Sequence, residues 1–208
     1  MESVSTASLD DDGWTVVPHL LTDEEVATIR RSCHELLSLP AGRREARDKP
    51  ASGTRHLAEL DRRLPLVASV LDRPAIRELV GSLLGERHEP GQVEFRSPRP
   101  GFGGQQLHAD DPPKLHDGPA TVATAIIALV DFTPRNGATS VLPGSHRRPD
   151  LQRRSGSLGS HPEAITVTCS AGDAVLFSGH LLHAGTRNDA DHEREAIQVV
   201  WRRSAATS

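Results

Sequence analysis

Several residue types are scarce in this chain of 208 residues, and each scarcity argues against a class of protein. The two cysteines, Cys33 and Cys169, are far apart and form no Cys-x-x-Cys pair, so neither a disulfide framework nor a thiolate zinc site is expected. Aromatic residues make up 3% of the chain and tyrosine is absent, which argues against a surface that stacks nucleic-acid bases. The net charge of -4 gives no basic footprint for nucleic acid either.

Long apolar runs are missing as well. No stretch approaches the roughly 20 apolar residues that a membrane-spanning helix needs. The sequence MESVSTASLDDDG at the start is acidic and has no apolar block of the kind found in secretory signals. We therefore expect a cytoplasmic protein that has no membrane partner. A hydrophobic share of 36% suits one globular domain, residues 1–208, that is large enough to enclose a pocket.

The N-terminal part of the chain has the pattern of helices. Thr22 and Glu25 are spaced as a capping box, and apolar side chains follow at helical intervals to residue 38. Pro74 suits a first helical turn and Gly85 a helix end, so a further helix is expected between them. The other elements expected here are a short strand at 13–21, a loop at 40–55 and a helix at about 57–71.

From about residue 92 the pattern changes to short strands separated by turn residues. Helices followed by many short strands predict an α+β, mainly β protein built around a barrel or jelly roll. Residues 13–90 would then give helical support and the first strand, and residues 92–203 the jelly-roll core. The expected strands are 92–97, 104–110, 121–131, 138–142, 165–169, 173–178, 180–184 and 194–202.

His108-Ala109-Asp110 is the first motif with a chemical meaning. On a strand, residues two apart point to the same face, so this imidazole and this carboxylate could converge on one metal ion. A second imidazole from a distant strand would complete the two-His, one-carboxylate triad, which leaves positions on Fe(II) open for a cosubstrate and O2. The motif is short, so its weight depends on finding that second histidine.

Two histidines compete for this position within AGDAVLFSGHLLHAGTRN, residues 171–188. Strand parity puts His180 and His183 on opposite faces, and the face of His183 is consistent with a barrel interior. Parity alone does not choose between them. Asp111, His116 and His161-Pro162-Glu163 are further candidate ligands, although the proline in the last disfavours a paired central strand.

Arg194 follows His183 by eleven residues, at the start of the last expected strand. A planar guanidinium can hold a carboxylate through two parallel hydrogen bonds. The distal carboxylate of 2-oxoglutarate needs such a partner while its keto-acid end chelates iron. The alternative is an ordinary surface charge on an edge strand.

Three blocks of the sequence carry a pattern in combination: GFGGQQLHADD at 101–111, TAIIALVDFTPRNGATSVLPGSH at 124–146, and GDAVLFSGHLLHAGTRN with Arg194 downstream. Together they resemble the phytanoyl-CoA dioxygenase family of Fe(II)/2-oxoglutarate oxygenases. The N-terminal DDGWTVVPHLLTDEEVATIRRSCHELL is also similar to the entry strand and helix of that family. The resemblance implies a double-stranded β-helix, which is a jelly-roll barrel, with supporting helices.

Position by position, the resemblance implies that His108, Asp110 and His183 bind the iron and that Arg194 binds 2-oxoglutarate. His180 matches no ligand position. Ile126 is a departure, because the family often has a tryptophan near the cosubstrate there. No catalytic residue beyond the metal centre is expected. From the strand pattern rather than the family, Gln106 shares the expected face of His108 and is a candidate contact to cosubstrate or substrate.

The resemblance further implies Fe(II), 2-oxoglutarate and O2 as cofactor and cosubstrates, with succinate and CO2 released. Oxidation of a small molecule, above all hydroxylation, is expected, and Asp110 argues against halogenation because halogenating relatives lack the carboxylate. The expected substrate is an amino acid or a natural-product intermediate, with a carrier-linked acyl group as the alternative. The loop 147–164 is a candidate lid.

Two other functions remain as alternatives. One is a catalytically silent jelly-roll protein that binds a metal or small ligand. The other is a cupin-type metalloenzyme that does not use 2-oxoglutarate, which would leave Arg194 without a role.

Overall fold

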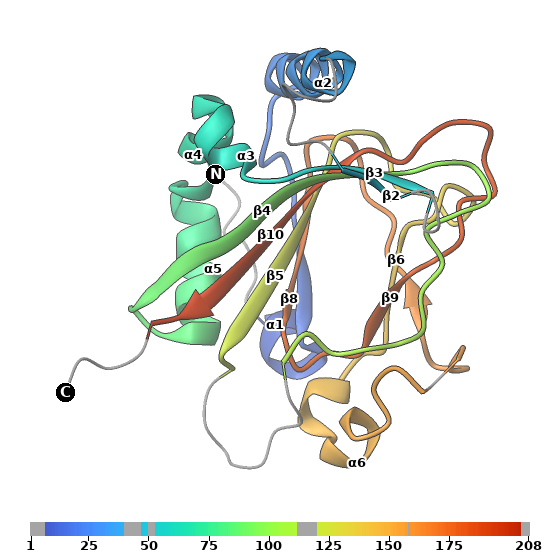
Figure 1. The fold of residues 1–208 in the computed structure, drawn as a ribbon. Helices are drawn as coiled ribbons and strands as arrows, with labels where there is room; N and C mark the ends of the chain where they lie inside the picture. Colours follow the sequence, from blue (N-terminus) through green and yellow to red (C-terminus); the bar gives the residue numbers. More distant parts are fainter. Residues whose placement is uncertain (1–6, 40–46, 50–52, 112–119, 158, 205–208) are drawn as a thin grey trace.

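Two antiparallel sheets face each other in the computed structural model, which describes residues 7–39, 47–49, 53–111, 120–157 and 159–204 (Figure 1). The large sheet has the strand order β1-β8-β5-β10-β4-β3-β2 and the small sheet the order β7-β6-β9. This arrangement confirms the expected α+β, mainly β fold of the jelly-roll type. The strands are β1 (Trp14–Val17), β2 (Arg47–Lys49), β3 (Thr54–Leu57), β4 (His88–Pro98), β5 (Val122–Ala128), β6 (Thr139–Val141), β7 (Ile165–Thr166), β8 (Ala174–Ser178), β9 (His183–Gly185) and β10 (Ala196–Arg203).

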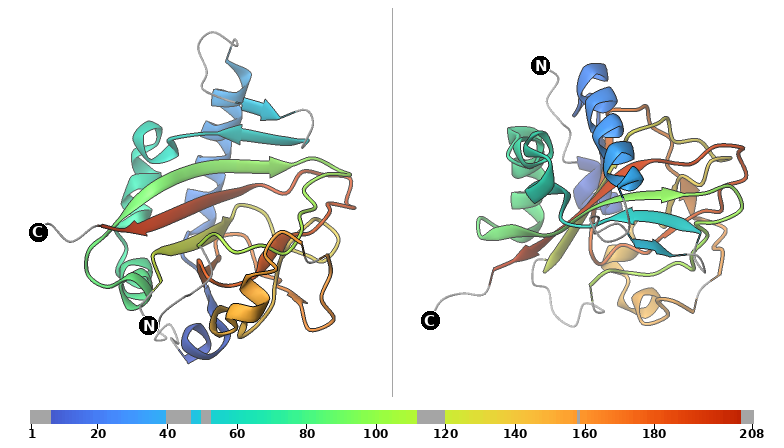
Figure 2. Two further views of the ribbon diagram at one scale, coloured as in Figure 1. Left: turned by 60° about the horizontal axis from the view of Figure 1, so that its bottom comes forward. Right: turned by 45° about the horizontal axis from the view of Figure 1, so that its top comes forward.

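The main helices pack against the outer face of the large sheet, as the two views of Figure 2 show. The capping box at the start of α2 is present: the Glu25 amide donates to Thr22 Oγ1 at 3.2 Å, and the Thr22 amide donates to Glu25 Oε2 at 2.9 Å. None of the described helices is long and apolar enough to cross a membrane. The helices are α1 (Ala7–Asp12), α2 (Asp23–Ser38), α3 (Leu60–Arg63), α4 (Pro65–Leu71), α5 (Pro74–Leu84) and α6 (Pro149–Gln152), with a 3₁₀ turn at Ser145–Arg147.

Strand alternation gives the large sheet one face for the helices and one for the interior of the barrel. On β10, Ile197 and Val199 are buried in the core shared with the helices, whereas Gln198 and Val200 line an interior cavity. On β5, Ile126 also faces this cavity and pairs with Gln198 in the register. The two sheets therefore enclose a space with polar and apolar walls.

Several expected elements differ from the structure. Residues 104–110 do not form a strand; Leu107 and His108 are isolated bridge residues, and His108 pairs with His183. The expected helix at 57–71 is two helices, because Leu64 is extended before Pro65, which begins α4. Residues 40–55, expected as a loop, include β2 and the start of β3, both of which join the large sheet. The short helix α1 was not expected at all.

Candidate metal centre

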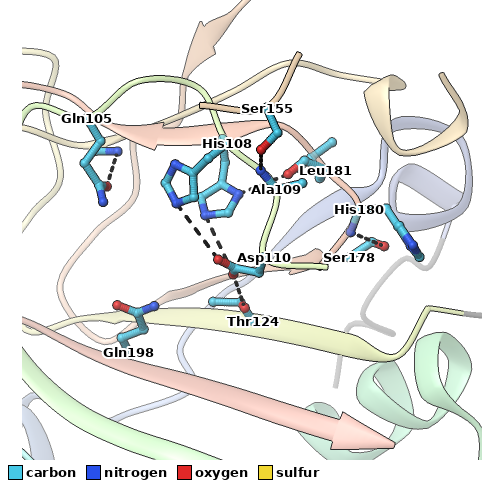
Figure 3. Close-up of polar contacts among 12 residues, drawn as sticks. Gln105, His108, Ala109, Asp110, Thr124, Ser155, Ser178, His180, Leu181 and Gln198 are labelled. Atoms are coloured by element: carbon cyan, nitrogen blue, oxygen red, sulfur yellow. Dashed lines mark hydrogen bonds and ion pairs between the residues drawn. The ribbon is translucent and has the colours of Figure 1, made fainter. Parts of the chain in front are cut away.

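Three side chains converge at one side of the interior cavity. His108, Asp110 and His183 each offer a ligand atom, and these atoms all lie within 4.8 Å of one another. Figure 3 shows the His108 ring turned toward the Asp110 carboxylate. His108 Nε2 is 3.9 Å from Asp110 Oδ1, and His183 Nε2 is 3.8 Å from Asp110 Oδ2. Within the described ranges, no other group of three such residues comes this close. Two imidazoles and one carboxylate at this spacing can bind one metal ion.

Both imidazoles are oriented by their own backbone. His108 and His183 exchange backbone hydrogen bonds of 2.9 Å in both directions, which fixes the two ligand residues side by side. His108 Nδ1 is 2.9 Å from the carbonyl oxygen of Gln106, and His183 Nδ1 is 3.0 Å from that of Leu181. A carbonyl accepts a hydrogen bond, so Nδ1 bears the proton in each ring and Nε2 presents its lone pair to the centre.

Burial favours the neutral form of His183, which is the form that binds a metal. Its side chain is buried, and its ring centroid is 4.4 Å from that of Phe177. This loss of solvent lowers the pKa of His183 below its ordinary value; the Asp110 carboxylate opposes the shift, and His108 adds to it. Position 185, two residues after His183, has no room for a side chain. A Cβ at Gly185 would lie 2.7 Å from the carbonyl oxygen of Gly103.

The Asp110 carboxylate is held by a hydroxyl from the large sheet. Thr124 on β5 is fully buried, and its Oγ1 donates to Asp110 Oδ2 at 2.7 Å. Asp110 itself lies in a bend with no strand pairing to orient it. The hydrogen bond therefore takes over the orientation that strand geometry was expected to provide. Thr124 could not be predicted as a site residue from the sequence, because one threonine in an apolar strand has no distinguishing pattern.

Replacement of Thr124 by valine is expected to weaken metal binding about 10- to 100-fold, since ligand orientation contributes affinity on this scale. Valine preserves the shape of threonine and removes only the donor. Titration of the metal-free protein with Co(II) measures the effect, and Thr124→Ser, which retains the hydroxyl, is the matched control. Equal affinity in the valine variant would show that the hydroxyl does not orient Asp110.

The competing candidates His180 and Asp111 pair with each other instead. His180 Nε2 is 3.6 Å from Asp111 Oδ2. The Asp111 carboxylate also accepts hydrogen bonds from the amide of Thr121 at 2.8 Å, from its hydroxyl at 2.6 Å and from the amide of Val122 at 3.2 Å. Asp111 thus fastens the end of the His-x-Asp segment to the start of β5. His116 lies outside the described residues, and His161 and Glu163 do not belong to the group of candidate metal ligands formed by His108, Asp110 and His183.

The cavity beside the three residues has a volume of about 570 Å³. Both sheets contribute to its walls, so it lies inside the barrel. Ile126, where the resemblance implied a departure from tryptophan, is part of the wall. The polar and charged lining residues are Thr54, Gln92, Arg96, Gln105, His108, Asp110, Thr139, His183, Arg187, Arg194, Gln198 and Arg202.

Arg194 lies in this cavity and is 8% exposed, so the alternative of a surface charge does not apply. Its guanidinium carbon lies 5.0 Å from the centroid of the Phe132 ring, and its Nε has no hydrogen-bond partner. Burial, aided by Arg96, lowers the pKa of Arg194 to about 10, so the group remains charged at neutral pH. A buried cation with an unmet donor fits a carboxylate ligand such as the distal end of 2-oxoglutarate.

Gln106 has a different environment from the one its sequence position suggested. Its side chain is exposed and does not line the cavity, because the chain around it is not a strand and parity does not apply. Its backbone carbonyl accepts from His108 Nδ1. The neighbouring Gln105 does line the cavity, where its Oε1 accepts from the Gly185 amide at 2.9 Å.

Two hydrogen bonds join the candidate lid, residues 147–164, to the segment that contains His108 and Asp110. The Ala109 amide donates to Ser155 Oγ at 2.9 Å, and the Gly156 amide donates to the carbonyl oxygen of Leu107 at 2.8 Å. Both contacts are next to the two ligands of the His-x-Asp motif. Residues 155 and 156 therefore support this motif.

A jelly roll with a two-His, one-carboxylate site and a buried arginine in the same cavity is the arrangement of a non-haem iron oxygenase. The family profile described as "Phytanoyl-CoA dioxygenase (PhyH)" matches residues 9–196, and the chain belongs to this family. It is an iron- and 2-oxoglutarate-dependent dioxygenase.

Similar proteins agree with this placement. The chain is 29% identical to "Ectoine dioxygenase" of Nocardia farcinica over 97% of its own length and 78% of that protein. It is 27% identical to "Dioxygenase ALT11" of Alternaria alternata over 92% of its own length and 68% of that protein. The solved structure of the "non-heme alpha ketoglutarate dependent epimerase SnoN from nogalamycin biosynthesis" shares the fold, with a TM-score of 0.77, 23% identity and coverage of 95% and 81%.

Proposed function

We propose that His108, Asp110 and His183 bind the Fe(II) of this dioxygenase and that Arg194 binds the distal carboxylate of 2-oxoglutarate. The observation that supports this most is that all four side chains line one cavity, with three ligand atoms within 4.8 Å of one another. Both imidazoles already present Nε2 to the centre. The open part of the cavity is the candidate binding space for the substrate.

Bound iron and 2-oxoglutarate supply the activation of O2, with succinate and CO2 as products and a hydrogen atom removed from the substrate. The residues of this chain hold the substrate and exclude water from the barrel interior. Hydroxylation of a small molecule, in natural-product metabolism, is the outcome we propose. Asp110 fills the position that a halide would need, which argues against halogenation.

The proposal is tested by mixing the protein with Fe(II) and 2-oxoglutarate without oxygen. A weak visible charge-transfer band is expected, because a chelating keto acid at Fe(II) absorbs there. Candidate substrates are then screened for stimulated succinate release in air. A protein that binds Fe(II) but gives no band would favour a cupin-type metalloenzyme. A protein that binds neither Fe(II) nor 2-oxoglutarate would favour a silent jelly roll.

A further inference from the structure

The charges that line the cavity are strongly unequal. Asp110 is the one carboxylate among the described lining residues, which include four arginines. In the proposed complex, Asp110 and dianionic 2-oxoglutarate balance Fe(II) and Arg194. A cleft lined by charges of one sign attracts ligands of the opposite sign, so the remaining arginines indicate the charge of what else binds there. These arginines are Arg96, Arg187 and Arg202.

Two of the three are accounted for by their neighbours. Arg187 Nε is 2.9 Å from Asp189 Oδ1 in an exposed ion pair. Arg96 on β4 pairs with Ala196 in the register and is close enough to lower the pKa of Arg194, so it belongs to the end of the cavity where 2-oxoglutarate is placed. It also donates to Gln198 Oε1 at 2.7 Å. Arg202 is an exposed residue of the cavity lining, and its guanidinium has no such partner among the described residues.

The strand register locates Arg202 relative to Thr124. Thr124, which holds Asp110, pairs with Val200 on β10, and Val122 pairs with Arg202. At about 3.3 Å per residue, the backbone of Arg202 begins about 7 Å beyond that of Val200. Arg194 lies in the opposite direction along the chain, before β10 begins. Along the chain, Arg194 and Arg202 therefore lie on opposite sides of Val200, the residue that pairs with Thr124.

The Arg202 side chain lies next to a local irregularity in the pairing of β4 and β10. The register between β4 and β10 shifts at Val200 and Trp201, so that Trp201 pairs with Pro90 and Gly91 has no partner. A Cβ at Gly91 would lie 3.5 Å from Cδ of Arg202, so the aliphatic stem of this arginine passes close to the glycine. Between Arg202 and the metal site the wall is formed by Val122 and Val200.

On the basis of the function proposed above, we propose that Arg202 binds an anionic group of the substrate, a carboxylate or a phosphate. The apolar part of the substrate then lies against Val122 and Val200 and brings a C–H bond to the metal site. The substrate class is thus a small molecule in which an acidic group is separated from the oxidised carbon by an apolar segment. This inference excludes cationic and neutral molecules as preferred substrates.

The test uses matched probes that differ only in charge. The protein is loaded without oxygen with Fe(II) and 2-oxoglutarate, and the binding of hexanoate, hexyl phosphate and neutral hexanamide is measured by calorimetry. An anion held by a guanidinium should bind about tenfold or more tightly than the amide. The stronger of the two anions identifies the acidic group.

Two variants locate the preference. Arg202→Gln is expected to reduce the preference for the anion to less than about twofold, whereas Arg187→Gln should retain it. The second variant removes the same charge from the same cavity, so it controls for a general electrostatic effect. Equal binding of hexanoate, hexyl phosphate and hexanamide to the unaltered protein would overturn the inference, as would a preference that survives in Arg202→Gln.

The same samples separate this inference from the function on which it rests. Arg202→Gln should still form the Fe(II)–2-oxoglutarate charge-transfer band, because Arg202 lies away from Arg194. A normal band without any anion preference would reject the role of Arg202 alone. An anion preference without a band in the unaltered protein would reject the proposed metal and cosubstrate site instead.

Discussion

Replacement of Asp110 by alanine is expected to abolish substrate-dependent succinate formation and to weaken iron binding by more than about 100-fold. The reason is that Asp110 provides the one carboxylate of the three candidate ligands and faces both imidazoles, 3.9 Å from His108 Nε2 and 3.8 Å from His183 Nε2. Titration with Fe(II) without oxygen measures the affinity, and succinate release measures turnover. Wild-type turnover in this variant would contradict the ligand assignment.

The neighbouring Asp111 offers a matched control. Asp111→Asn removes a carboxylate one residue away, yet Asp111 contacts Thr121, Val122 and His180 and is not part of the metal cluster. The variant should lose about 1–3 kcal/mol of stability, because a buried hydrogen-bond acceptor is altered. The affinity of the Asp111→Asn variant for Fe(II) should equal that of the unaltered protein. Opposite outcomes for the two variants would transfer the ligand role from Asp110 to Asp111.

That His108, Asp110 and His183 converge could be predicted from the sequence, because this prediction depends on residue type and order along the chain. His-x-Asp, a distant histidine and an arginine downstream form a pattern that survives local changes of backbone. The geometry of the cluster could not be predicted in the same way. His108 and Asp110 were expected to share one face of a strand, whereas the structure has an isolated bridge at His108 and a bend at Asp110.

What replaces the strand is a set of tertiary contacts that sequence patterns do not encode. Thr124 orients Asp110 from a strand that is remote in the sequence, and Ser155 supports Ala109 from another segment. The same holds for the pairing of β2 and β3 with the large sheet. Residues 40–55 have the composition of a loop, and the place of β3 beside β4 and of β2 beside β3 follows from packing rather than propensity. By contrast, the capping box of α2 is local and was confirmed as expected.

Replacement of Arg194 by alanine is expected to raise the 2-oxoglutarate concentration needed for half-maximal turnover about 100-fold, because a charge-assisted, two-pronged contact to a carboxylate is lost. Arg194→Lys retains the charge without the planar fork and should give an intermediate value. Succinate release at varied 2-oxoglutarate provides the measurement, and Arg187→Gln is the control for lost charge in the cavity. Its guanidinium is already paired with Asp189, so the 2-oxoglutarate dependence should not change.

Thermal unfolding gives a second and independent outcome for the same variant. The buried guanidinium of Arg194 lies over Phe132 without a partner for Nε, so its removal relieves an uncompensated charge and should leave the ligand-free protein about as stable. Addition of 2-oxoglutarate and metal should raise the melting temperature of the unaltered protein much more than that of Arg194→Ala. An unchanged dependence on 2-oxoglutarate in both measurements would remove Arg194 from this role. The role would then pass to Arg96, the other guanidinium at this end of the cavity.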